Sequence, residues 1–132
     1  MTLFEECIEA LGSNIVILSE KQTHGYFEQL SGKFPITSWA RIDWDKICNK
    51  KIINEIDDLN NWFNENKISS LDVNILWNNA GIPGVKTNLQ NALQVLDDVL
   101  AVAPDTFMYN IEEGYVIEFL HDGEITVGLN NF

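Results

Sequence analysis

Two histidines are the side chains of this chain best suited to acid-base chemistry. His24 lies in a segment of weak periodicity, and His121 lies next to the turn sequence Asp122-Gly123. A hydrolase needs a nucleophile held by a base and a third group that orients the base. No serine supplies that nucleophile, because none sits in a nucleophile-elbow context: Ser13, Ser19, Ser31 and Ser38. We therefore interpret both histidines as surface or turn residues, and we predict no catalytic residues.

Three pairs of adjacent acids could be imagined as glycosidase carboxylates or as metal ligands. They are Asp57-Asp58, Asp97-Asp98 and Glu112-Glu113. Neighbouring acids on a helix or a turn diverge into solvent, and none of the pairs has the spacing of a calcium loop. The two cysteines, Cys7 and Cys48, have neither a CxxC spacing nor a matching histidine pair, which predicts reduced thiols. We thus expect no metal and no cofactor, and a protein that is not an enzyme.

The segment DVNILWNNAG, residues 72–81, resembles a segment of short-chain dehydrogenases that lies beside their nicotinamide cofactor. The other parts of such a site are absent from the sequence. No GxxxGxG loop follows the first predicted strand, and Tyr115 is followed four residues later by Phe119 instead of lysine. The motif is therefore interpreted as an ordinary turn after a strand.

Negative charge concentrates in the last third of the chain. No Lys or Arg occurs from Thr87 to Phe132, while this stretch holds eight carboxylates: Asp97, Asp98, Asp105, Glu112, Glu113, Glu118, Asp122 and Glu124. The whole chain of 132 residues has a formal net charge of −12. DNA, RNA and anionic membranes attract basic proteins, so this charge argues against them as direct partners. It favours a basic protein as the partner.

The elements that must position these residues follow from apolar spacing. Helices are expected over residues 3–11, 19–32, 45–63 and 87–103, with capping boxes at Thr2/Glu5, Ser19/Gln22 and Thr87/Gln90. Strands are expected over 15–18, 38–44 and 73–77, followed by a three-stranded meander within 105–129. The predicted fold is α+β: residues 1–132 form a single domain, with a mixed sheet of about five to six strands that ends in an antiparallel meander and has helices packed against it.

The register of the final hairpin is predicted from its turn. If Asp122-Gly123 forms a two-residue hairpin turn, Leu120 pairs with Ile125 and Val116 with Leu129. One face of the preceding strand then carries Tyr115, Ile117 and Phe119, and the opposite face is apolar as well. Two arrangements satisfy this pattern: helices cover both faces, or one face is open and meets a partner together with the acidic turns.

Aromatic residues close to acids indicate where a partner would bind. Tyr and Trp supply much of the binding energy of protein interfaces, while acids around them speed the encounter with a basic surface. For Trp39 and Trp44 we favour core packing. The predicted partner-binding residues are Asp43, Asp45, Tyr109, Glu112, Glu113, Tyr115, Asp122 and Glu124.

A small, strongly acidic chain with aromatics among its acids and no catalytic motif is similar to the immunity proteins of bacterial polymorphic toxins, including the contact-dependent growth inhibition type. The similarity is one of whole-chain character and brings no diagnostic residues. It implies an inhibitor that binds the toxic carboxy-terminal domain of a cognate partner, often a basic nuclease, and blocks its active site or nucleic-acid surface. The amino terminus has no basic, apolar signal segment, and we expect a cytoplasmic protein.

One alternative belongs to another functional class. A small-molecule-binding domain or enzyme would use a pocket between the sheet and the predicted helix 87–103. A concave apolar pocket with convergent polar groups would favour it. A third possibility is a housekeeping adaptor of the cytoplasm that binds a basic protein without inhibiting it.

Overall fold

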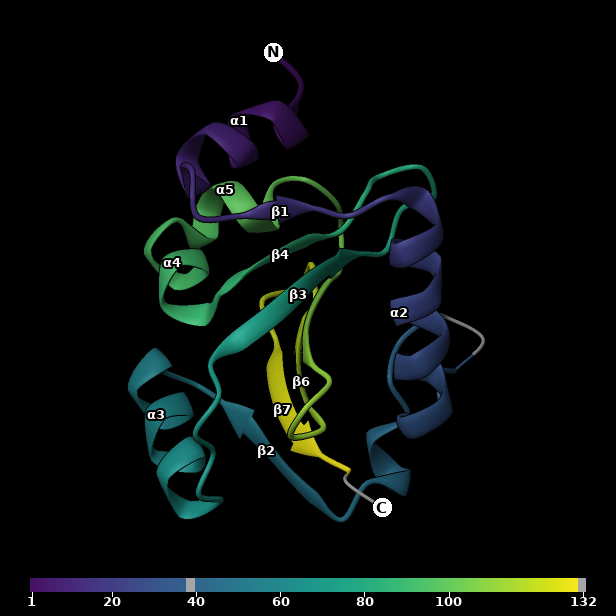
Figure 1. The fold of residues 1–132 in the computed structure, drawn as a ribbon. Coiled ribbons are helices and arrows are strands. Elements are labelled where there is room, and N and C mark those ends of the chain that lie inside the picture. The colour runs from purple at the N-terminus through teal and green to yellow at the C-terminus, as the bar shows by residue number, and fades with distance from the viewer. Residues whose placement is uncertain (38–39, 131–132) are drawn as a thin grey trace.

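The computed structural model describes residues 1–37 and 40–130, which form one seven-stranded sheet with helices on both sides (Figure 1). The strand order is β1-β4-β3-β5-β6-β7-β2. The strands are β1 Val16–Ile17, β2 Asn49–Ile53, β3 Asp72–Trp77, β4 Val85–Asn88, β5 Thr106–Asn110, β6 Tyr115–Phe119 and β7 Ile125–Leu129. All strand pairs among the described residues are antiparallel. The α+β class is confirmed. The sheet is antiparallel instead of mixed, and it has seven strands where about five to six were expected.

Six helical segments accompany the sheet in the part of the chain that the structure describes. They are α1 Leu3–Leu11, α2 Glu20–Lys33, the 3-10 turn η1 Trp44–Lys46, α3 Ile56–Glu65, α4 Leu89–Gln94 and α5 Leu96–Leu100. The capping boxes predicted at Thr2 and Ser19 are both present, because each hydroxyl accepts a backbone N–H three residues later and the N3 side chain returns the contact. The start of α1 and the start of α2 are therefore determined by local sequence.

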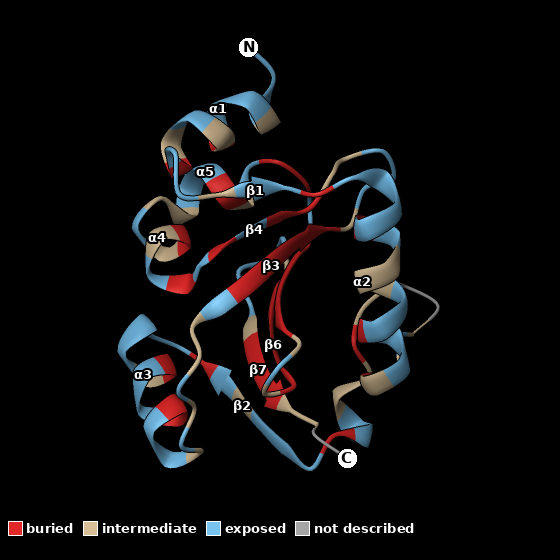
Figure 2. Cartoon of the chain, in the orientation of Figure 1, coloured by how far each residue is buried: buried red, intermediate tan, exposed pale blue. Residues whose placement is uncertain are grey.

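Helices cover both faces of the sheet. α1, α3, α4 and α5 pack on the face that carries Tyr115, Ile117 and Phe119. α2, Phe34 and the segment 42–47 pack on the other face, against Tyr109 and Val116. In Figure 1, α2 lies on the opposite side of the sheet from α3 and α4, and Figure 2 shows the central strands buried between them. Of the two arrangements left open by the sequence, the covered sheet is the one observed.

The predicted helix 45–63 is wrong in its first half. Residues Asn49–Ile53 form β2, which pairs with β7 as an edge strand, and the helix begins only at Ile56. The Ile52, Ile53, Ile56 spacing fits a helix, but β7 needs hydrogen-bond partners along its free edge, and tertiary pairing overrides the local pattern. Of the predicted strand 38–44, residues 38–39, including Trp39, lie outside the described residues; the described remainder makes one bridge, between Ile36 and Ile42.

The predicted helix 87–103 starts late and is interrupted. Thr87 belongs to β4, where it pairs with Val73, so the cap is Asn88, whose side chain accepts the N–H of Gln90 at 2.9 Å. Val95 leaves the helical conformation, with φ −123° and ψ 35°, and separates α4 from α5. Pairing of β4 with β3 thus shortens the helix that capping residues alone would predict.

The β6–β7 register differs by one residue from the predicted one. Phe119 pairs with Ile125 and Tyr115 with Leu129. The turn has three residues instead of two, because the N–H of Leu120 donates to the carbonyl of Glu124 at 3.0 Å and that of Gly123 donates to Leu120 at 2.9 Å. Gly123 has φ +93°, as in a type I turn followed by a bulge. One extra loop residue accounts for the shift.

Candidate partner-binding surface

Two of the eight predicted partner-binding residues lie in the core. Tyr109 and Tyr115 are both 0% exposed and lie on opposite faces of the sheet. The Tyr115 hydroxyl donates to the carbonyl of Ser70 at 2.9 Å, and its ring centroid is 5.0 Å from that of Phe63. Burial raises the pKa of both tyrosines. This corrects the expectation that they anchor a partner: their apolar neighbours are supplied by the chain itself.

Glu113 has an internal role as well. Its carboxylate accepts the backbone N–H of Ser69 at 3.1 Å and also that of Ser70, which joins the turn after β5 to the segment after α3. Its own N–H donates to the Asn110 side chain at 2.7 Å. Glu112, one residue before it, is exposed. The two adjacent acids therefore differ: Glu113 organises the backbone and Glu112 faces solvent.

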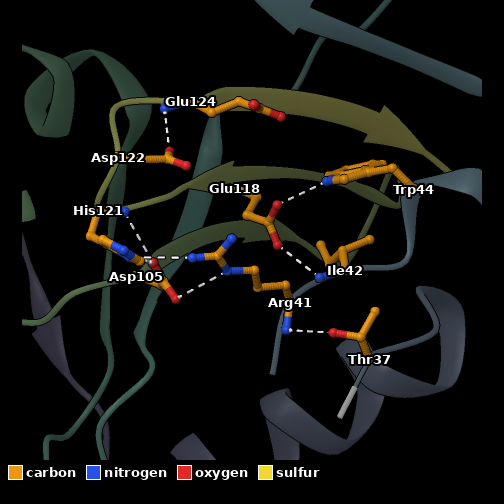
Figure 3. A network of polar contacts seen from close by, with 9 residues as sticks. All are labelled: Thr37, Arg41, Ile42, Trp44, Asp105, Glu118, His121, Asp122 and Glu124. Atoms are coloured by element: carbon orange, nitrogen blue, oxygen red, sulfur yellow. Dashed lines mark hydrogen bonds and ion pairs between the residues drawn. The ribbon is translucent and has the colours of Figure 1, made fainter. Parts of the chain in front are cut away.

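Asp105, His121 and Arg41 form a polar network at one end of the sheet (Figure 3). The Asp105 carboxylate accepts the backbone N–H of His121 at 3.1 Å and lies 3.2 Å from its ring Nδ1. Arg41 is the chain's single arginine. Its Nε lies 4.0 Å from the Asp105 carboxylate, and its Nη2 lies 3.4 Å from His121 Nδ1. The Asp105 side chain is 8% exposed, so the arginine compensates a largely buried charge.

Glu118 extends this network under the segment 41–44. One carboxylate oxygen accepts the N–H of Ile42 at 2.8 Å, and the other accepts the indole N–H of Trp44 at 2.9 Å. Burial raises the pKa of Glu118, and the two hydrogen bonds oppose that effect. The Trp44 ring packs against Gly128 of β7, where an added Cβ would lie 2.3 Å from it. These contacts hold the segment on the sheet, and they confirm the packing role favoured for Trp44.

The contacts of the network are all accounted for by structural roles in the described residues. Asp105 and His121 resemble an orienting acid and its base, but the polar contacts of the His121 ring within residues 1–37 and 40–130 are those with Arg41 and Asp105. Nδ1 can donate to Asp105 or accept from Arg41, and cannot do both at once. In the same ranges, no group of three or more His, Cys, Asp or Glu side chains could hold a metal ion. The arrangement is suited to fixing the loop on the sheet.

The exposed acids fall at two ends of the sheet. Asp122 and Glu124 lie in the β6–β7 turn, beside His121 and Asp105 (Figure 3). Glu112 lies in the β5–β6 turn, at the other end of β6. Asp45 is exposed in η1, and Asp43 is half-buried with its carboxylate 3.8 Å from the Lys46 ammonium. The predicted acids therefore form no single compact patch, and the pair Asp122/Glu124 is the one next to a network of fixed side chains.

Two cavities lie along α2, near the end of the sheet that carries Asp122 and Glu124. The larger, about 680 Å³, lies between α2, the end of β3 and the loop 78–83. The smaller, about 260 Å³, shares Phe27 and Asn78 with it. Neither is lined by residues of the segment 87–103, whose inner side chains belong to the core on the opposite face. Both cavities therefore lie on the other side of the sheet from the position expected for a ligand pocket.

Comparison with known proteins decides the family. A family described as CdiI immunity protein EcoliA0-like matches residues 1–128. The chain belongs to this CdiI immunity protein family. The resemblance drawn from charge and composition is confirmed, and the family is one of immunity proteins that neutralise a toxin.

The chain is also 58% identical over 36 residues to the uncharacterized protein YqzI of Bacillus subtilis strain 168. The matched residues make up 27% of this CdiI-family chain and 69% of YqzI. That name carries no function. Within the described residues, no helix of this CdiI family member has the length and apolar character needed to span a bilayer.

Sequence reasoning did not identify Asp105 and Glu118 as structural acids. A signal existed for Glu118, because it interrupts the apolar run of β6, YVIEF, and an acid in a strand buried on both faces needs hydrogen-bond donors. For Asp105 the pairing with the single arginine depends on a contact between residues 64 positions apart, which spacing does not indicate.

Proposed function

We propose that this CdiI family member binds a basic toxin domain, of the nuclease class, and occludes its active or substrate-binding site. The observation that carries the proposal is the pair of exposed carboxylates at Asp122 and Glu124, in the turn of the β6–β7 hairpin of a chain of net charge −12. Carboxylates there would take the place of substrate phosphates on the toxin's Lys and Arg side chains. The protein would act in the cytoplasm as a stoichiometric inhibitor without catalytic turnover.

Exposure supports a partner surface made of the exposed members of the predicted set. Asp122 and Glu124 are retained as contacts, and Glu112, Asp45 and Asp43 as charges that steer the encounter. Tyr109, Tyr115 and Glu113 are occupied within the fold. Because a charge contributes to steering from a distance comparable to the Debye length, acids outside the contact can still raise the association rate.

Co-expression with the toxin domain encoded in an adjacent upstream reading frame tests the proposal. The expected result is a stable complex in which the toxin no longer degrades DNA or RNA in vitro. A toxin that remains active in the complex would show that its site is not occluded. A toxin that is inhibited but degrades neither nucleic acid would remove the nuclease class and leave neutralisation intact.

The small-molecule alternative retains one supporting observation, the cavity of about 680 Å³, whose volume is in the range typical of ligand sites. It differs from the position expected from sequence, since it lies beside α2. Thermal-shift screening of the protein with metabolites would support this alternative if one compound raised the unfolding temperature in a concentration-dependent manner.

A further inference from the structure

The two cavities beside α2 lie next to each other. Phe27 and Asn78 line both of them, so the larger cavity borders the smaller one along the helix. On α2, the larger is lined by Glu20, Thr23, His24 and Phe27, and the smaller by Phe27, Glu28, Leu30 and Ser31. This spacing of three to four residues is one stripe of the helix. We call the combined feature the α2 groove.

The wall of the groove is held in place by contacts inside the fold. The hydroxyl of Thr23 is buried, donates to the carbonyl of Ser19 at 2.9 Å and accepts the N–H of Gly84 at 2.9 Å, which ties the loop to α2. An added Cβ at Gly84 would lie 3.0 Å from the carbonyl of Ile75, so a side chain at this position would crowd the backbone of β3. A groove fixed in this way needs little reorganisation to receive a ligand.

The lining combines an apolar floor with acidic and amide groups. Phe27, Trp77, Ile82 and Phe107 supply large apolar side chains, and Ile36 at the smaller cavity is 38% exposed. Glu20 and Glu28 are exposed and are the charged groups of the lining besides His24; no Lys or Arg lines either cavity. In the described part of the chain, the side chains of Asn78 and Asn79 hydrogen-bond to no other residue. They are free to bind a peptide backbone.

We infer that the α2 groove receives a segment of the toxin domain that presents a Lys or Arg side chain next to a large apolar one. The inference rests on the proposed function and names the contact region. The alkyl stem of Lys or Arg would lie on Phe27 and Ile82, with its charged group between Glu20 and Glu28. The Glu28 carboxylate, now 3.0 Å from His24 Nε2, would exchange this histidine for the incoming cation.

The groove and the acidic turn lie at the same end of the sheet. The backbone N–H of Asn78, which lines both cavities, donates to the carbonyl of Asp105 at 3.0 Å. Asp105 in turn holds His121, next to Asp122 (Figure 3). Acids that attract a basic domain are therefore adjacent to a preformed apolar site that could retain it. The chemistry of both features points to a cationic partner with an apolar anchor.

The test compares groove variants with charge-matched and size-matched controls, using the cognate toxin domain as the probe. Ala80→Trp fills the larger cavity from an exposed position, and Asn60→Trp on α3 is its control. Glu20→Lys with Glu28→Lys reverses the charge at the rim of the groove. Glu9→Lys with Glu65→Lys makes the same change of charge on α1 and α3. At 150 mM salt, we expect the groove variants to raise the dissociation constant by at least about tenfold and the controls to raise it by less than about threefold.

Hydrogen exchange provides a second measurement that does not depend on the variants. Amides of α2 and of the loop 78–83 should become protected when the wild-type protein binds the toxin domain. The inference would be overturned if the folded groove variants bound the toxin domain as well as the controls do and α2 of the wild-type protein gained no protection. A small molecule would then be the remaining candidate occupant of the groove. Failure of the wild-type protein to bind the toxin domain would instead reject the proposed function.

Discussion

The indole nitrogen of Trp44 lies 2.9 Å from a carboxylate oxygen of Glu118, a residue 74 positions later in the chain. Glu118 is 1% exposed, and its second oxygen accepts the N–H of Ile42. One carboxylate thus satisfies two donors of a segment that has little regular structure of its own. This contact fixes the segment 41–44 over β6 and β7 and closes one face of the sheet.

Replacing Glu118 should destabilise the fold. Glu118→Ala leaves the N–H groups of Ile42 and Trp44 buried without an acceptor, which predicts a loss of about 1–3 kcal/mol in the free energy of unfolding. Urea unfolding followed by Trp fluorescence would measure it. The matched control is Glu112→Ala, an exposed acid for which we expect a change within about 0.5 kcal/mol. Equal effects of the two substitutions would contradict the structural role of Glu118.

The stability contributed by Glu118 should depend on pH in a defined direction. Burial raises its pKa above the ordinary value of 4.5, so between these two values the folded protein binds the proton more tightly than the unfolded chain does. The wild-type protein should therefore gain stability relative to Glu118→Gln as the pH falls from the raised pKa towards 4.5, and lose it as the pH rises. The unfolding free energy of both proteins would be measured as a function of pH. In the difference between them, the contributions of the other carboxylates cancel.

Two glycines should respond to alanine in opposite ways. Gly128→Ala places a Cβ 2.3 Å from the ring of Trp44, so we expect a loss of about 1–3 kcal/mol from overpacking. Gly25 lies inside α2 with negative φ and with no atom within 4 Å of an added Cβ. Gly25→Ala should stabilise the protein by about 0.4–1 kcal/mol. Thermal unfolding of both variants checks the pair, and stabilisation by Gly128→Ala would contradict the packing described for Trp44.

The two cysteines should differ in reactivity. Cys7 is 0% exposed, and burial, assisted by the charge of Asp98, raises its pKa to about 11, whereas Cys48 is exposed. The thiolate is the reactive form, so a thiol reagent at neutral pH should modify one cysteine in the native protein and two after unfolding. Mass spectrometry would identify the site. Rapid modification of Cys7 under native conditions would show that α1 opens readily.

Charge at the β6–β7 turn should control association with the toxin more than charge at the opposite end. Asp122→Asn with Glu124→Lys preserves the acceptor that Asp122 offers to the N–H of Glu124. We expect association to slow by at least about tenfold at low salt. Asp45→Asn with Glu112→Lys makes the same change of charge elsewhere and should slow it by less than about threefold. Stopped-flow measurements would show equal effects if only net charge mattered.

Local sequence was a good guide where short-range contacts decide the structure. Thr2 and Ser19 start their helices as expected, because a capping box needs only residues three positions apart. The predictions failed where a partner strand intervened. Asn49–Ile53 joined the sheet instead of α3, and Thr87 joined β4 instead of capping a helix. In both cases the backbone hydrogen bonds of a neighbouring strand outweighed a helical pattern.

The candidate site was only partly foreseen for a related reason. Exposed acids at Glu112, Asp122 and Glu124 follow from turn sequences, but the burial of Tyr109 and Tyr115 depends on the helices that cover the sheet. The α2 groove joins α2 to a loop more than fifty residues away, through Thr23 and Gly84. No spacing rule connects such residues.

Sequence alone determined the class of the molecule: an acidic α+β chain without catalytic motifs, similar to immunity proteins. These properties follow from composition and from contacts within a few residues. Only the tertiary structure decided which of the eight carboxylates in the last third remain available to a partner. Asp105, Glu113 and Glu118 satisfy donors from distant segments, whereas Asp122 and Glu124 face solvent. The physical reason is that burial of a charge requires partners, and those partners are brought together by the fold.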